Sequence, residues 1–187
     1  MKKIYPFIIC FLLLPVASYA VDFSFGFQAG LRTVSDSEIK NVYGNGTCFF
    51  PYAAINVFKG FTIGAGYELG YSREGKIGLY EEATTLKVTG VQAFVGFQYS
   101  VSMVTPYVFV GFGSFSYKQT VESEAAQDVD ATKSTFFVAG GIKIYPMKNI
   151  YISAEVKYVP LKVQPYDEEV DLGGLRLMGG LGFTFGY

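Results

Sequence analysis

The sequence predicts an all-β protein, an eight-stranded antiparallel transmembrane β-barrel with short periplasmic turns and longer extracellular loops. Three observations lead to this prediction. The 187-residue chain is 50% hydrophobic and 18% aromatic but only 17% charged, which is unusual for a soluble protein. Apolar side chains alternate with glycine or polar ones, and this period of two is typical of strands. The connections between the alternating segments are short and long in turn, as in outer-membrane barrels.

The composition also excludes several functions. The 15 basic and 16 acidic residues give a net charge of −1, without the basic excess of a nucleic-acid-binding protein. The chain has no histidine, so a Ser-His-Asp triad, a Cys-His dyad and a histidine-based metal site are excluded. Glu68 or Glu155 could act as a base, but no nucleophile is evident beside either residue. We therefore expect a protein that is not an enzyme and that needs no cofactor or metal.

The first 20 residues are predicted to be a secretory signal peptide. Lys2 and Lys3 precede the uncharged apolar run Ile4–Val16, and small residues stand at the −3 and −1 positions of a cut after residue 20. A retained membrane anchor is the alternative, but the run is shorter than the roughly 20 apolar residues of a spanning helix. We expect one mature domain at residues 21–187.

Each predicted strand has an apolar face and a face of glycine and polar residues. In the fifth strand both faces are apolar, so its facing is ambiguous, and we assign Val108, Val110 and Phe112 to lipid. The eight strands are predicted at residues 23–32, 47–58, 60–71, 86–99, 105–117, 133–145, 149–161 and 175–187.

Two other architectures are alternatives to the transmembrane barrel. Helical membrane spans are disfavoured because alternation, rather than uniform hydrophobicity, organises even the uncharged stretch 88–117. A soluble sandwich or lipocalin-like barrel would turn its apolar face inward. Its outer surface would then be unusually poor in charge, whereas lipid outside explains both faces. We therefore also expect aromatic belts at the strand ends, with Tyr67, Tyr71, Tyr117 and Tyr158 in the upper belt.

The inside of an eight-stranded barrel is just wide enough for side chains to fill. Inward glycines leave room for large inward rings such as Phe50, Tyr52, Phe94 and Phe137, so we expect a packed interior without a broad pore. Five charged residues fall on the inward faces, and buried charges need partners. They are a structural salt-bridge network or, alternatively, a gate whose pairs exchange to pass small cations. The predicted lumenal network is Arg32, Glu68, Glu155, Lys157 and Arg176.

Two of the long loops, 118–132 and 163–173, are acidic. Such clusters could hold divalent cations or bridge through them to lipopolysaccharide, but their spacing does not match the twelve-residue calcium loop. A solvated rim that keeps the loops soluble is the simpler interpretation. The clusters comprise Glu122, Glu124, Asp128 and Asp130 in the first loop and Asp167, Glu168, Glu169 and Asp171 in the second.

Two segments carry a resemblance to a known family. The ending Leu181-Gly-Phe-Thr-Phe-Gly-Tyr187 and the segment Thr105–Gly113 resemble strands of the small outer-membrane barrels, such as the OmpA transmembrane domain, OmpX and the opacity-type proteins. The resemblance implies that Phe183, Phe185 and Tyr187 form a signal for the barrel-assembly machinery. It also implies an outer-membrane location among lipid and lipopolysaccharide. The expected role is structural or adhesin-like, through four extracellular loops and a host or surface ligand, with a narrow ion channel as the alternative.

Overall fold

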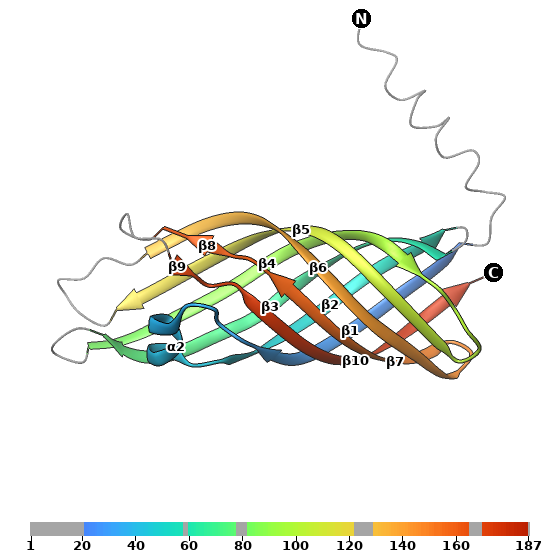
Figure 1. Cartoon of the computed structure of the whole chain (residues 1–187), viewed down its shortest axis with the longest axis horizontal. Helices are drawn as coiled ribbons and strands as arrows, with labels where there is room; N and C mark the ends of the chain where they lie inside the picture. Colours follow the sequence, from blue (N-terminus) through green and yellow to red (C-terminus); the bar gives the residue numbers. More distant parts are fainter. Residues whose placement is uncertain (1–20, 58–59, 78–81, 122–128, 165–169, 187) are drawn as a thin grey trace, which may run out of the picture.

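The computed structural model describes residues 21–57, 60–77, 82–121, 129–164 and 170–186. Eight strands close into one antiparallel barrel in the order β1-β10-β7-β6-β5-β4-β3-β2, so the predicted fold class is confirmed (Figure 1). The barrel strands are β1 Asp22–Arg32, β2 Gly46–Val57, β3 Phe61–Ile77, β4 Glu82–Gln98, β5 Val104–Val121, β6 Val129–Met147, β7 Ile150–Val159 and β10 Gly174–Gly186. The signal-peptide prediction concerns residues 1–20, outside the described part of the chain, and stays a prediction.

The first and last strands close the barrel. β1 pairs with β10 along its whole length, from Asp22 opposite Gly186 to Arg32 opposite Arg176. Val21, Gly186 and the short connections therefore lie together at one end, which we call the turn end (Figure 1). The opposite end, which we call the loop end, carries the helix α2 (Ser37–Tyr43) and the short strands β8 (Lys162–Val163) and β9 (Val170–Asp171).

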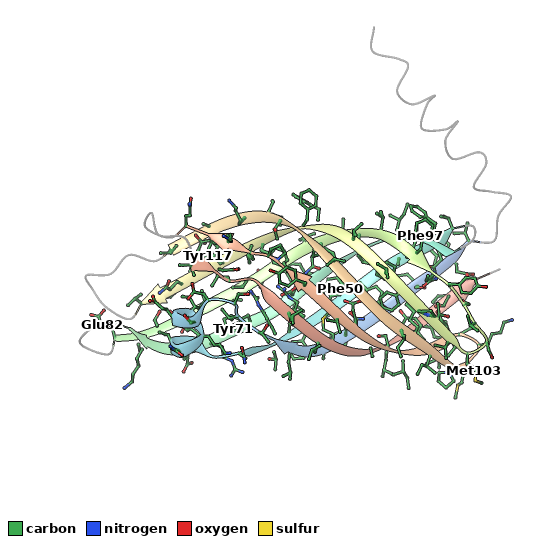
Figure 2. The ribbon with its side chains drawn as sticks, in the orientation of Figure 1. Phe50, Tyr71, Glu82, Phe97, Met103 and Tyr117 are labelled. Atoms are coloured by element: carbon green, nitrogen blue, oxygen red, sulfur yellow. The ribbon has the colours of Figure 1, made fainter. Side chains whose placement is uncertain are left out.

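The outer face of the barrel is apolar along most of its height. Val108, Val110 and Phe112 of β5 are exposed, which confirms the facing assigned to the fifth strand. Aromatic side chains gather on the outside near the turn end, where Phe97 and Tyr99 are among the most exposed residues (Figure 2). This apolar surface with aromatic ends is the one that a barrel presents to lipid.

Strands β3 to β6 extend past the other strands at the loop end, and in β4 and β5 the polarity of the two faces is reversed there. In β4 the outward residues are Val91 and Val95 in the middle of the barrel but Lys87 nearer the loop end. The inward residues Leu86 and Val88 of the same segment are buried and apolar. The apolar side of the sheet thus changes from outside to inside along a single strand. Segments predicted as loops are therefore continuations of these four strands.

The prediction that Tyr71 belongs to an outer aromatic belt is wrong. The register between β3 and β4 shifts between Glu68 and Tyr71, and Gly70 within this bulge has a φ of +93°. A bulge adds one residue to one strand and turns the following side chains to the opposite face. Tyr71 consequently points inward and is buried, whereas Tyr67 and Tyr158 are exposed as predicted. The prediction is wrong for Tyr117 as well, because this residue lies on the inward face of β5 together with Phe115 and is buried.

The loop end contains structure that the sequence pattern did not predict. Asp36 caps α2, because its Oδ1 accepts hydrogen bonds from the backbone N–H groups of Glu38 at 2.9 Å and Ile39 at 3.1 Å. β8 and β9 form a separate two-stranded sheet. Buried side chains from these elements and from the extended strands form one apolar cluster: Val34, Tyr43, Leu86, Val88, Phe115, Tyr117, Leu161, Val163 and Leu172. Among the described residues, no helix is long and apolar enough to span a membrane.

Candidate functional site

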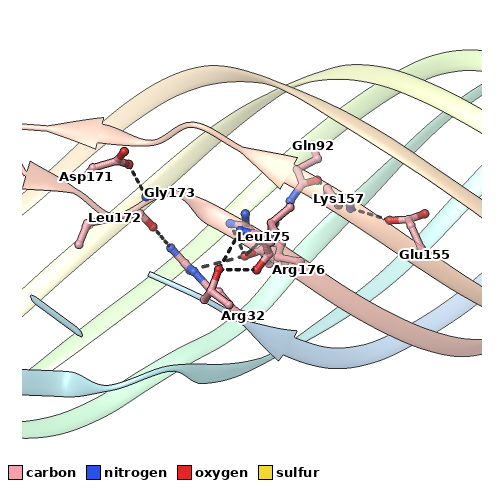
Figure 3. A network of polar contacts seen from close by, with 11 residues as sticks. Arg32, Gln92, Glu155, Lys157, Asp171, Leu172, Gly173, Leu175 and Arg176 are labelled. Carbon is pink, nitrogen blue, oxygen red and sulfur yellow. Dashed lines mark hydrogen bonds and ion pairs between the residues drawn. The ribbon is translucent and has the colours of Figure 1, made fainter. Parts of the chain in front are cut away.

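The five predicted lumenal charges are all buried, and three of them meet below the loop end (Figure 3). Glu68 of β3 reaches across the lumen to Arg32 of β1 and Arg176 of β10. Arg176 donates from Nε to Glu68 Oε1 at 2.9 Å, and its Nη2 lies 2.9 Å from the same oxygen. Arg32 Nη1 lies 3.6 Å from Glu68 Oε1. The structure thus brings two guanidinium groups onto one carboxylate oxygen.

A glutamine joins this triad to the other two predicted charges. Gln92 of β4 donates from Nε2 to Glu68 Oε2 at 2.7 Å and accepts at Oε1 from Lys157 Nζ at 3.2 Å. Lys157 of β7 lies 3.4 Å from Glu155 Oε1 of the same strand. Glu155 Oε2 in turn accepts from the Tyr107 hydroxyl at 2.9 Å. All five predicted charges therefore belong to one network, and the amide of Gln92, which was not among the predicted site residues, connects its two halves.

A sixth buried charge, Lys143 of β6, was not included in the predicted network. Its Nζ donates to Gln98 Oε1 at 3.0 Å and lies 5.5 Å from the ring centre of Tyr107 and 5.0 Å from that of Tyr151. The period-two pattern already places Lys143 on an inward face, so the signal was present in the sequence. The described lumen therefore contains four buried cations and two buried carboxylates.

Aromatic rings cover every one of these cations. Lys157 Nζ lies 3.7 Å from the ring centre of Phe50, and the Arg32 guanidinium carbon lies 5.0 Å from that of Tyr71. Such cation–π contacts contribute about 2 kcal/mol when they are desolvated. A cavity of only about 10 Å³ remains among Phe50, Phe94, Phe137 and their neighbours. The middle of the barrel, where Phe50 lies (Figure 2), is packed, as predicted from the inward glycines and rings.

Hydrogen bonds hold the loop end onto this network. Arg32 donates from Nη2 to the carbonyl oxygen of Leu172 at 2.7 Å, and the Tyr71 hydroxyl donates to the carbonyl oxygen of Gly44 at 2.9 Å. Tyr43 of α2 hydrogen-bonds through its hydroxyl to Thr84 of β4 at 3.1 Å. Burial raises the pKa of this tyrosine, which keeps the hydroxyl protonated. The helix and the β8–β9 sheet are thereby fixed to the barrel wall.

The outer surface at the loop end is rich in hydroxyl and amine groups. Lys87 of β4 lies directly opposite Lys118 of β5, and Lys118 lies opposite Asp130 of β6. All three side chains are exposed. We call the outward polar residues of β4 to β6 at the loop end the polar wall. It consists of Lys87, Lys118 and Asp130 together with seven hydroxyl residues: Thr85, Thr89, Ser114, Ser116, Thr120, Thr132 and Ser134.

Two of the eight predicted acidic loop residues lie in the described part of the chain, and both are in strands rather than loops. Asp130 is in β6, and Asp171 is in β9, where its Oδ1 accepts from the backbone N–H of Gly173 at 2.8 Å. The described residues contain no group of three or more acidic or cysteine side chains able to hold a metal ion. Outside the described residues lie Glu122, Glu124, Asp128, Asp167, Glu168 and Glu169.

The predicted assembly signal lies at the turn end. The rings of Phe183 and Phe185 are 4.3 Å apart, and Phe185 also packs edge-on against Phe25 of β1 at 6.2 Å. Tyr187 is outside the described residues. The role of these residues in recognition by the assembly machinery stays a prediction.

The comparison with protein families matches residues 7–186 to the outer membrane protein beta-barrel domain. This match covers nearly the whole chain and agrees with the closed eight-stranded topology. The chain belongs to this family. It is therefore an outer-membrane transmembrane β-barrel, and the family resemblance deduced from the sequence is confirmed.

Solved structures of other outer-membrane barrels are similar to this one. OprG of Pseudomonas aeruginosa gives a TM-score of 0.68 at 11% identity over 90% of this chain and 96% of that chain. Ail of Yersinia pestis, in complex with the heparin analogue sucrose octasulfate, gives 0.53 at 18% identity over 89% and 99%. Neisserial surface protein A gives 0.53 at 15% identity over 89% and 97%. At these identities the similarity shows the fold alone. No curated protein matches the sequence at a significant level.

Proposed function

We propose that this outer-membrane barrel is a non-enzymatic protein with an adhesin-like surface role, carried by its loop end facing the exterior of the cell. The observation that supports this proposal most strongly is the extension of β3 to β6 beyond the apolar outer face. In β4 and β5 the extension is polar outside and apolar inside, which is the arrangement expected for a segment that stands in water. A rigid protruding wall offers a ligand a surface whose groups are already in place.

The packing of the loop end supports this interpretation. The apolar cluster beneath α2 and the β8–β9 sheet orders the wall, and an ordered surface loses less entropy on binding than a flexible loop. The exposed amines of Lys87 and Lys118 lie on neighbouring strands, with hydroxyl residues around them. Paired amines among hydroxyls suit an anionic glycan, through charge-assisted hydrogen bonds. The complex of Ail with a heparin analogue makes a sulfated glycan a reasonable first probe.

The test compares the adhesion of cells that carry three forms of the protein. Cells producing the wild type are expected to bind heparin-coated and matrix-coated surfaces more strongly than vector controls. The Lys87→Glu/Lys118→Glu variant is expected to lose at least about fivefold of this binding. Lys148→Glu is the matched control, because Lys148 is exposed at the turn end on the opposite side of the membrane. Wild-type cells that bind no better than vector controls would refute the surface role.

A narrow ion channel is the second candidate, favoured by the polar network that runs through the lumen. At the turn end the barrel opens into a pocket of about 610 Å³, lined by polar residues that include Asn56, Gln98 and Thr105. The four cations and two carboxylates of the described lumen favour anions, contrary to the cation preference expected from the sequence. Discrete, anion-selective conductance steps in planar bilayers are expected for a channel, and recordings without steps exclude it.

A further inference from the structure

The triad of Arg32, Glu68 and Arg176 has an excess of positive charge. Arg32 and Arg176 occupy directly opposite positions on the hydrogen-bonded strands β1 and β10, where like charges are unfavourable. Their side chains are 1% and 0% exposed. One carboxylate balances two guanidinium groups, so the triad carries one positive charge in a region without bulk water. An uncompensated charge in such a place is costly.

Several N–H donors of the two guanidinium groups have no acceptor. Among the described residues, Arg32 Nε and Arg176 Nη1 have neither a hydrogen-bond nor an ion-pair partner. Arg32 Nη1 and Arg176 Nη2 make only their ion-pair contacts with Glu68 and form no hydrogen bond. Buried polar groups are nearly always hydrogen-bonded, so a set of unused donors on two facing arginines needs an explanation.

Both buried carboxylates of the described lumen are already engaged. The second oxygen of Glu68 accepts from Gln92, and Glu155 is bound by Lys157 and Tyr107. One aromatic ring lies over each guanidinium group, Tyr71 at 5.0 Å from that of Arg32 and Phe115 at 5.7 Å from that of Arg176. No other carboxylate of the described residues forms an ion pair with either arginine. Among the described residues, no further carboxylate therefore supplies the missing negative charge.

We propose that Arg32 and Arg176 form a buried binding site for a small monovalent inorganic anion of the chloride type. A single negative charge neutralises the triad, and the unused N–H groups of both arginines supply hydrogen bonds to it. A divalent anion would over-neutralise the triad, and a large organic anion would not fit among the packed rings. This site lies inside the barrel and is independent of the surface role proposed for the loop end.

The test measures the stability of the refolded barrel in a non-ionic detergent while bromide replaces gluconate at constant ionic strength. Gluconate is too large for the site, and bromide stands in for chloride. Binding to the folded state alone raises the unfolding midpoint with bromide concentration, following the logarithmic form for a single site. Arg176→Met is expected to raise the half-saturating concentration at least about tenfold. The matched control is Lys143→Met, which removes another buried cation and is expected to leave the bromide response intact.

A second variant and a direct observation cover the case in which Arg176→Met fails to fold. Glu68→Gln raises the charge of the triad to two, so it is expected to lower the half-saturating bromide concentration at least about tenfold. Crystals grown in bromide are expected to show an anomalous-scattering peak between the two guanidinium groups. The proposal is overturned if bromide stabilises the wild type no more than gluconate does, or if no such peak appears because water alone bridges the donors.

Discussion

Replacing Glu68 with alanine is expected to be the most destabilising change among the lumenal charges. The substitution removes the acceptor of two short hydrogen bonds, from Arg176 Nε at 2.9 Å and Gln92 Nε2 at 2.7 Å. It also raises the charge of the triad from one to two, with Arg32 and Arg176 left facing each other. Breaking a buried ion pair by removing one partner costs about 3–5 kcal/mol, and we expect Glu68→Ala to fall in this range.

Urea unfolding of the refolded protein in detergent measures this cost. The chain has no tryptophan, so the change in strand content by circular dichroism is the suitable signal. Sodium gluconate is the salt of choice, because it prevents an inorganic anion from compensating for the lost carboxylate. The matched control is Glu74→Ala on the same strand, whose exposed side chain is expected to contribute within about 0.5 kcal/mol. If Glu68→Ala costs less than about 1 kcal/mol, the network does not stabilise the barrel and the reasoning fails.

Three further substitutions test the network and the backbone by the same urea assay. Lys157→Met is expected to cost about 3 kcal/mol, because it leaves Glu155 buried without its cation. A Lys157→Met/Glu155→Gln double variant should recover at least about half of that loss. Additive effects of the two substitutions would contradict the pairing. Gly70→Ala is expected to cost about 1–2 kcal/mol through its positive φ alone, because the added Cβ would make only an ordinary contact with the ring of Phe49 at 3.6 Å. An unchanged midpoint would argue against the bulge. Gly182→Val should cost about 1–3 kcal/mol by displacing the ring of Tyr151, and a neutral effect would show that the interior is looser than the structure indicates.

The sequence identified five of the six charges that are buried in the described lumen. A charged residue on the inward face of a strand must be buried in a barrel this narrow, so the period of two alone selected Arg32, Glu68, Glu155, Lys157 and Arg176. The pattern could not determine which of them pair. Pairing across a barrel depends on the stagger of strands far apart in the sequence, and a single alternating pattern does not encode that stagger.

Tyr71 illustrates a different limit of the sequence pattern. The alternation of inward and outward residues places Tyr71 on the outside if it continues without interruption through Gly70. The positive φ of that glycine introduces a bulge, which inverts the face of every later residue in β3. The sequence signal for the bulge is one glycine among 22 in the chain, and many of the other described glycines make room for a neighbouring ring. A bulge therefore could not be distinguished from an ordinary inward glycine.

The extended strands explain why the loop end was predicted as loops. Above Val91 of β4 the outward face becomes polar, and the predicted strand begins only at residue 86, whereas β4 begins at Glu82. The period of two continues through this polar part of the strand, with Lys87 outside and Leu86 and Val88 inside. Such an inversion is expected wherever a strand leaves lipid and enters water, because the solvent outside changes while the packed side remains inside. The membrane boundary in this chain is therefore marked by the residue at which the apolar face changes sides. The end of the apolar outer face alone does not mark it.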